Sequence, residues 1–172
     1  DTLFNAQLNS LKEEGNYRIF AELERKCGQF PRADNHCEDG KREVTVWCSN
    51  DYLAMGQHPK VIGAMEEALH DVGAGSGGTR NIGGNTHLHV ELENELADLH
   101  GKESALLFTS GYVSNDATLS TLGKLLPGCV IFTDELNHAS IIEGCRLAGG
   151  ETFRYKHNDL GDLERTLQKI PR

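Results

Sequence analysis

The sequence lacks a long hydrophobic run, and its cysteines show no paired spacing. No apolar stretch approaches the roughly 20 residues that a membrane-spanning helix needs, which excludes a membrane protein and predicts a soluble one. The five cysteines are an odd number and stand far apart without a C-x-x-C pair. This pattern excludes a disulfide framework and a zinc knuckle, and it indicates a reducing compartment.

The chain also lacks an excess of positive charge. Its 17 Lys and Arg residues stand against 26 Asp and Glu residues, which gives a net charge of −9. A general attraction to nucleic acid or to an anionic membrane is therefore excluded. An anionic ligand must instead be held by local groups such as Arg18, Arg80 or a helix N-terminus, so the charge balance favours a small-molecule site.

A starting methionine and a recognisable targeting segment are absent as well. The chain begins at Asp1, shows no apolar signal core or Arg-rich transit pattern, and stops at Pro171-Arg172. Its 172 residues suffice for one domain or for a piece of a larger one. We expect a fragment of a longer protein, which acts in the cytoplasm of a bacterium or in the mitochondrial matrix of a eukaryote.

Glycine, by contrast, is concentrated in residues 72–84, where it surrounds the cluster Thr79-Arg80-Asn81. The stretch contains a G-x-G-x-x-G match, but a predicted helix precedes it, whereas the dinucleotide-binding motif requires a strand there. It also lacks the Gly-Lys-Ser/Thr ending of a P-loop. A flexible linker remains one interpretation. The embedded cluster favours the other, a loop that closely approaches a ligand or another backbone segment.

The N-terminal part is predicted to be a helical arm. Apolar residues between positions 2 and 25 have helical spacing with a break at Gly15-Asn16, so two helices are expected. Polar residues 29–42 predict a loop, and residues 44–48 predict a strand. We therefore divide the chain into an arm and loop, 1–43, and the first part of a large cofactor-binding α/β domain, 44–172.

The second part alternates short apolar runs with amphipathic segments, which is typical of βαβ units with a parallel sheet. The expected strands after the arm are 105–108, 129–133 and 152–155. The expected helices are 59–72, 88–99, 112–124, 139–147 and 159–170.

Two loops that follow predicted strands, 109–112 and 133–138, are expected to face one crevice, because ligands bind beyond the carboxyl ends of parallel strands. Ser110-Gly111 precedes a helix, where free N–H groups attract an anion, and Ser110 and Tyr112 add hydroxyl groups. Ser110 acting only as a helix cap is an equal alternative. His138 opens the next helix, and it is either structural or a group for acid–base chemistry or ring stacking. The pair His87 and His89 lacks metal-binding spacing, so no metal site is predicted.

Five blocks in order resemble the α-oxoamine synthases, pyridoxal-phosphate enzymes of the aspartate-aminotransferase fold type. The blocks are Trp47-Cys48-Ser49-Asn50-Asp51-Tyr52-Leu53, Gly75-Ser76-Gly77-Gly78-Thr79-Arg80-Asn81, Phe108-Thr109-Ser110-Gly111-Tyr112, Asn137-His138-Ala139-Ser140 and His157-Asn158-Asp159. The resemblance implies the N-terminal part of fold type I, an α/β fold with a helical arm and a partial, mainly parallel sheet. It also implies a pyridoxal 5'-phosphate cofactor and a homodimer with its active site at the subunit interface.

The blocks are most similar to the branch that makes 5-aminolevulinate from glycine and succinyl-CoA. The resemblance places Ser110, Gly111 and Tyr112 at the cofactor, with His138 stacked on its ring. It assigns the acyl-CoA substrate to Arg18, Asn50, Thr79, Asn81 and Thr133. Thr152 departs from the Lys that the family commonly has, and the cofactor-bearing lysine is expected beyond Arg172, so the fragment alone should be inactive. Another α-oxoamine synthase, such as 2-amino-3-ketobutyrate CoA ligase, and a non-catalytic dimerisation module are the alternatives.

Overall fold

The computed structural model describes residues 2–170. The expectation of a longer protein used Asp1 and the pair Pro171-Arg172. These three residues lie outside the described residues. The chain divides into two compact units, Asp1–Gly75 and Ser76–Arg172, which are described separately.

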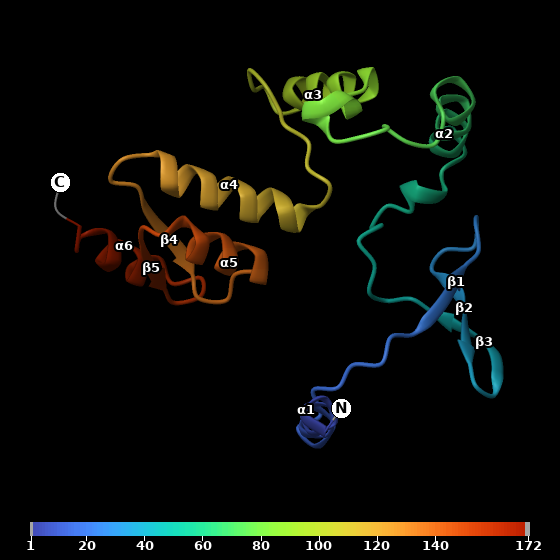
Figure 1. Cartoon of the computed structure of the whole chain (residues 1–172), viewed down its shortest axis with the longest axis horizontal. Coiled ribbons are helices and arrows are strands. Elements are labelled where there is room, and N and C mark those ends of the chain that lie inside the picture. Colours follow the sequence, from blue (N-terminus) through green and yellow to red (C-terminus); the bar gives the residue numbers. More distant parts are fainter. Residues whose placement is uncertain (1, 171–172) are drawn as a thin grey trace. The chain divides into compact units, whose positions relative to one another are not determined.

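The first unit begins with one helix and a small antiparallel sheet (Figure 1). Helix α1 spans Thr2–Glu13, and strands β1, Glu22–Arg25, β2, Arg32–Cys37, and β3, Gly40–Thr45, follow. The sheet has the order β1-β2-β3 with both pairs antiparallel. Three expectations are therefore wrong: the second helix of the arm is absent, residues 29–42 form most of a hairpin, and the strand expected at 44–48 ends at Thr45.

Charged pairs across the sheet explain why its strands were missed in the sequence. Asp34 is only 4% exposed, and its carboxylate accepts hydrogen bonds from Lys26 at 2.8 Å and pairs with Lys41 at 2.7 Å. Glu24 pairs with Lys41 at 2.7 Å and with His36 at 2.8 Å. Cross-strand ion pairs stabilise such a sheet without the alternation of apolar and polar residues on which strand prediction depends.

Helix α2, Pro59–Val72, closes the first unit and confirms the expected helix. Pro59 stands in its first turn, where a missing backbone N–H costs nothing. The His58 side chain caps the helix, because its Nδ1 accepts the N–H of Lys60 at 3.2 Å. Gly73 ends it with a φ of 84°, a conformation that glycine adopts without strain.

The second unit contains a single turn of π-helix, η2, Arg80–Gly84, and then α3, His87–Leu99, α4, Gly111–Leu125, and α5, Ala139–Ala148. Strands β4, Val130–Asp134, and β5, Glu151–Tyr155, pair in parallel, and α6, Leu160–Leu167, follows β5. All the helices predicted here and both of these strands are present, and Asp159 caps α6 as expected, although α6 ends at Leu167 and not at residue 170.

Helices α4 and α5 pack against each other, and small residues make this approach possible (Figure 1). A Cβ atom on Gly144 would lie 2.9 Å from the Cβ of Leu119, and one on Gly123 would lie 2.4 Å from the Cβ of Ala148. Both distances are shorter than a normal carbon–carbon contact, so glycine is required at these two positions.

The expectation of a mainly parallel sheet is not met, since the parallel sheet has two strands and the antiparallel sheet has three. Residues 105–108, which were expected to be a strand, form none. The N–H of Leu107 donates instead to Glu93 Oε1 at 2.7 Å. A strand is defined by its ladder partner, and no described strand pairs with this apolar run.

The buried hydrophobic residues are few and small: Ala33, Ala97, Cys145 and Ala148. The larger apolar side chains on α2 and α3 remain accessible, as in Leu69, which is 51% exposed, and Leu92, which is 48% exposed. Among residues 2–170, no helix has the length and apolar character needed to cross a membrane.

Candidate functional site

The glycine-rich loop folds into a tight turn at which two backbone segments touch. The carbonyl oxygen of Thr79 accepts the N–H groups of Ile82, Gly83 and Gly84 at 3.0, 3.2 and 2.8 Å. A Cβ atom on Gly84 would lie 1.8 Å from the carbonyl oxygen of Gly78. The expectation that glycine serves a close approach is therefore confirmed at Gly84, where the close neighbour is backbone.

Arg80 anchors this turn to helix α3. Its Nη2 donates to Glu93 Oε2 at 2.9 Å, its Nη1 donates to Oε1 of the same carboxylate, and its Nε donates to Asn85 Oδ1 at 2.8 Å. The bond from Arg80, followed by the N–H of Leu107, lowers the pKa of Glu93 to about 2. The suggestion that Arg80 holds an anionic ligand is thus corrected, because an internal carboxylate already takes both of its terminal nitrogens.

A hollow of about 700 Å³ adjoins the loop within the second unit. Thr79 lines it, whereas Asn81 is exposed and does not. The lining comes from the loop, from α3 and from the segment before α4: Ser76, Gly78, Thr79, Arg80, Gly84, His89, Leu92, Leu107, Phe108 and Thr109.

The start of α4 has the cap that the sequence suggested. Ser110 Oγ accepts the N–H of Val113 at 3.2 Å, so Ser110 is the N-cap. The N–H groups of Gly111 and Tyr112 have no hydrogen-bond partner among residues 2–170, as is usual in a first helical turn. The helix dipole adds partial positive charge at the same point, so this turn is suited to an anion.

His138 lies next to this helix start, as the sequence predicted for the two loops. The rings of Tyr112 and His138 have centroids 6.1 Å apart in an edge-to-face arrangement with an interplanar angle of 75°. Both side chains remain accessible to solvent. The structure therefore brings together Ser110, Gly111, Tyr112 and His138, which come from the starts of two packed helices.

The His138 ring is held in place by a chain of hydrogen bonds that runs through the buried Ser140. Its Nδ1 accepts the N–H of Ser140 at 3.2 Å and lies 2.7 Å from Ser140 Oγ. Ser140 is fully buried, and its Oγ accepts from Asn115 Nδ2 at 3.0 Å. An accepting Nδ1 places the proton of the neutral ring on Nε2. Sequence reasoning missed the role of Asn115, which stands five residues after Ser110 on α4.

Thr133 is 5% exposed near the end of β4, where its Oγ1 accepts from Asn137 Nδ2 at 2.7 Å. The following Asp134 joins the loops after β4 and β5, since it accepts the N–H of Leu136 at 2.9 Å and that of Asn158 at 3.1 Å. The Leu136 N–H and then His157 lower the pKa of the Asp134 carboxyl. Thr133 is therefore a buried residue whose hydroxyl is fixed by the loop that follows β4.

Thr152 lies in a separate hollow of about 400 Å³ beside α5, which Thr133, Arg146 and Arg154 also line. Its buried Oγ1 has no hydrogen-bond partner among the described residues. Cys145 borders the same hollow, and burial raises the pKa of its thiol. The five cysteines are all free thiols.

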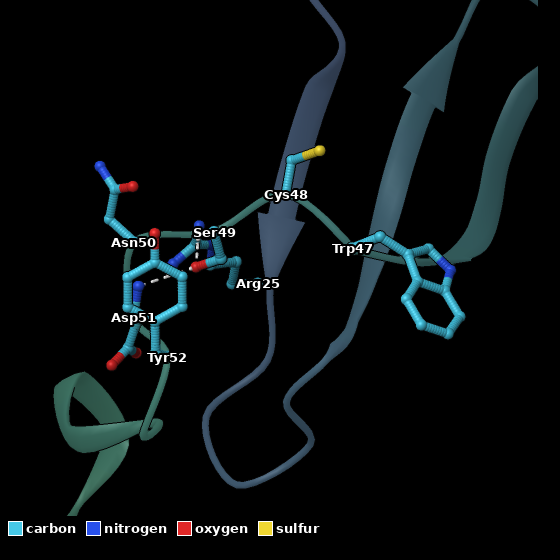
Figure 2. Close-up of a pocket in the computed structure, with 7 residues that line it drawn as sticks. All are labelled: Arg25, Trp47, Cys48, Ser49, Asn50, Asp51 and Tyr52. Carbon is cyan, nitrogen blue, oxygen red and sulfur yellow. Dashed lines mark hydrogen bonds between the residues drawn. The ribbon is translucent and has the colours of Figure 1, made fainter. Parts of the chain in front are cut away.

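Two of the predicted substrate residues belong to the first unit. The turn Trp47–Tyr52 forms a hollow of about 750 Å³ with Arg25, and Asn50 is one of the residues that line it (Figure 2). Ser49 Oγ organises this turn by accepting from Arg25 Nη2 at 3.4 Å and from the N–H of Asp51 at 3.1 Å. Arg18 is exposed in the irregular segment between α1 and β1, and it does not line the hollow.

Metal ligands do not gather in the part of the chain that the structure describes. Residues 2–170 contain no group of three His, Cys, Asp or Glu side chains placed to hold an ion. His87 instead pairs with Glu91 at 3.1 Å on the surface of α3, and His89 Nδ1 contacts Thr86 Oγ1 at 2.7 Å.

A protein-family model for class I and II aminotransferases matches residues 42–172. The chain belongs to this family. It is 60% identical over 96% of its length to a 5-aminolevulinate synthase from Bradyrhizobium diazoefficiens, and 62% identical over 95% to 5-aminolevulinate synthase 1 from Cereibacter sphaeroides. It spans 40% of each of these relatives. A mitochondrial 5-aminolevulinate synthase from Emericella nidulans is 52% identical over 99% of the chain and 26% of the relative.

Solved structures agree with this family membership. A serine palmitoyltransferase variant from S. paucimobilis, solved with bound pyridoxal phosphate and myriocin, is 30% identical, with a TM-score of 0.78 over 99% of this chain and 42% of that chain. The class I and II aminotransferase fold is therefore present here in part, with its α/β character carried by two small sheets.

Proposed function

We propose that this protein is a 5-aminolevulinate synthase, which condenses glycine with succinyl-CoA and releases CoA and carbon dioxide. The observation that carries the proposal is the 60% identity to a 5-aminolevulinate synthase across 96% of the chain. The solved serine palmitoyltransferase is only 30% identical, which favours the aminolevulinate-forming branch over that sister activity. The proposal concerns the whole enzyme, because this chain spans only 40% of the length of that relative.

The residues at the starts of α4 and α5 fit a pyridoxal phosphate cofactor. The unpaired N–H groups of Gly111 and Tyr112 offer donors to a phosphate at the positive end of a 15-residue helix. A Cβ atom on Gly111 would meet nothing within 4 Å, so this turn is open to a ligand. The cofactor supplies an electron sink that stabilises a carbanion at the α carbon of glycine.

His138 orients the cofactor ring in this proposal. Its imidazole is exposed for stacking, and the chain through Ser140 and Asn115 fixes the plane in which it lies. Tyr112 meets His138 edge to face at 6.1 Å, which limits rotation of either ring. Ser110 supports the site indirectly, because its hydroxyl caps α4 and so holds the first turn in place.

The acyl-CoA substrate is assigned to Arg18, Asn50, Thr79, Asn81 and Thr133. Arg18 is exposed and has no ion pair among the described residues, and its planar guanidinium suits the free carboxylate of a succinyl group. Arg80 lacks this freedom because Glu93 already binds it. Thr79 lines a hollow and Asn81 is exposed, so both are accessible to a ligand.

We further infer a homodimer with the active site at the subunit interface. The large accessible apolar side chains of α2 and α3, among them Met65 at 68% exposure, support this inference, because such patches mark surfaces that pack against other protein. We place the enzyme in the cytoplasm of a bacterium, or in the mitochondrial matrix of a eukaryote. The higher identity to the bacterial relatives, 60–62% against 52%, favours the first compartment.

The decisive experiment is to express the full-length protein and to assay glycine with succinyl-CoA, acetyl-CoA or palmitoyl-CoA. We expect 5-aminolevulinate from succinyl-CoA, and an absorbance band of bound pyridoxal phosphate that weakens in His138→Ala. Turnover of acetyl-CoA without turnover of succinyl-CoA would identify a different α-oxoamine synthase. A protein that binds no cofactor and turns over no thioester would support the non-catalytic dimerisation module instead.

A further inference from the structure

One partly buried carboxylate connects three segments of the second unit. Glu93 lies on α3, and its side chain is 14% exposed. Its two oxygens accept from both terminal nitrogens of Arg80, and Oε1 also accepts the N–H of Leu107 at 2.7 Å. The glycine-rich loop, α3 and the segment that leads to α4 therefore meet at one side chain.

This arrangement differs from that of the neighbouring acidic residues. Glu91 and Glu95 are exposed on the same helix, and Glu95 makes no hydrogen bond or ion pair among residues 2–170. A carboxylate is costly to bury unless hydrogen bonds and an opposite charge compensate it. Glu93 has both, in the bidentate geometry that gives an arginine–carboxylate pair its directional strength.

The partners of Glu93 are adjacent to the residues assigned to substrate and cofactor. Arg80 stands between Thr79 and Asn81, and the Thr79 carbonyl is the acceptor for the whole turn. Leu107 precedes the Ser110 cap by three residues. Holding Arg80 and Leu107 on one carboxylate thus fixes the distance between the loop and the segment that enters α4.

We propose that Glu93 is a positioning residue for the acyl-CoA substrate, which holds Thr79 and Asn81 in their binding orientation through Arg80. This inference rests on the proposed function of the loop. Glu93 does not touch the substrate. It acts by keeping the loop in one conformation before the substrate binds. Binding then loses no affinity to the entropic cost of ordering the loop.

The test compares Glu93→Gln with Glu95→Gln in the full-length enzyme. Both variants remove one negative charge from α3, but only the first weakens the bond to Arg80. We expect Glu93→Gln to raise the KM for succinyl-CoA roughly tenfold, with little change in kcat or in the KM for glycine. Glu95→Gln should match the wild-type enzyme in all three values.

Hydrogen exchange gives a readout that does not depend on activity. In Glu93→Gln, the amides of Ile82, Gly83 and Gly84 should exchange faster, because their turn loses its anchor. The amides of α5 should be unchanged. A Glu93→Gln enzyme with wild-type exchange in the loop and a wild-type KM for succinyl-CoA would overturn the inference.

A third variant separates this inference from the proposed function. Thr79→Val removes a hydroxyl that the proposal assigns to the substrate, and it leaves Glu93 and Arg80 intact. If Thr79→Val raises the KM for succinyl-CoA and Glu93→Gln does not, the positioning role is wrong. If neither variant changes it, the assignment of the loop to the acyl-CoA fails, and with it the positioning role.

Discussion

Gly84 illustrates how one residue determines the shape of the glycine-rich loop. Its missing side chain admits the carbonyl of Gly78, whose oxygen would lie 1.8 Å from an added Cβ atom. The contact is with backbone, which cannot move aside as a flexible side chain can. Gly75, in the same loop, is different: an added Cβ atom would meet nothing within 4 Å, and its φ lies outside the left-handed range.

We therefore predict that Gly84→Ala destabilises the full-length protein by about 1–3 kcal/mol, the usual cost of overpacking, while Gly75→Ala has little effect. Urea unfolding of the two variants measures the difference. Gly84→Ala should also raise the KM for succinyl-CoA, because the turn that carries Thr79 must open. Equal stability of the two variants would contradict the close approach seen in this loop.

At the scale of elements, a hydrogen bond between a partly buried asparagine and a buried serine joins α4 to α5. Ser140 is fully buried at the start of α5, and Asn115 of α4 donates to it at 3.0 Å. Ser140 Oγ also lies 2.7 Å from His138 Nδ1. The position of α4, through Asn115, therefore affects the orientation of His138 at the start of α5.

Ser140→Ala should lower the free energy of unfolding by about 1–3 kcal/mol, because it leaves the partly buried amide of Asn115 without this hydrogen-bond partner. Ser114→Ala, on α4, is the matched control, since that hydroxyl has no hydrogen bond among the described residues. We also expect Ser140→Ala to shift the ring signals of His138 in an NMR spectrum. Unchanged signals would show that the ring is held by other contacts.

Prediction from the sequence succeeded for elements whose signal is local. Helix α2 has Pro59 in its first turn and α6 has an Asp159 cap, and both were placed correctly. The β1-β2-β3 sheet was missed because ion pairs such as Lys41 with Asp34 stabilise it, and these connect different strands. The expected strand at 105–108 failed for the converse reason: its apolar pattern is local, but a strand also needs a partner.

Part of the candidate site could likewise be predicted from the sequence, and part of it could not. Ser110, Gly111, Tyr112 and His138 were grouped by the rule that loops after strands face one crevice. The structure places them together, although residues 105–108, ahead of Ser110, form no strand. Glu93 gave no such signal, because a glutamate on an amphipathic helix is usually solvated. Only its distance from Arg80 and Leu107 in the folded chain distinguishes it from Glu95.

At the scale of the whole molecule, paired carboxylates connect stability to pH. Several have a pKa lowered by hydrogen bonds or ion pairs, so the folded chain binds fewer protons in acid than the unfolded chain does. They are Glu14, Glu24, Asp34, Glu93, Asp134, Glu143 and Asp162. A lowered pKa contributes stability that is complete above the unfolded value and is lost as the pH falls through the folded value.

Glu93 defines most sharply the pH range in which this stability is lost, because folding lowers its pKa from 4.5 to about 2. Its contribution should be constant at neutral pH and should disappear between pH 4.5 and 2. We predict that the urea midpoint of the full-length protein decreases through this range, and that Glu93→Gln shows a shallower decrease than either the wild-type protein or Glu95→Gln. Identical slopes in all three proteins would mean that Glu93 does not hold its charge against acid in the fold, and that Arg80 is anchored by something other than this carboxylate.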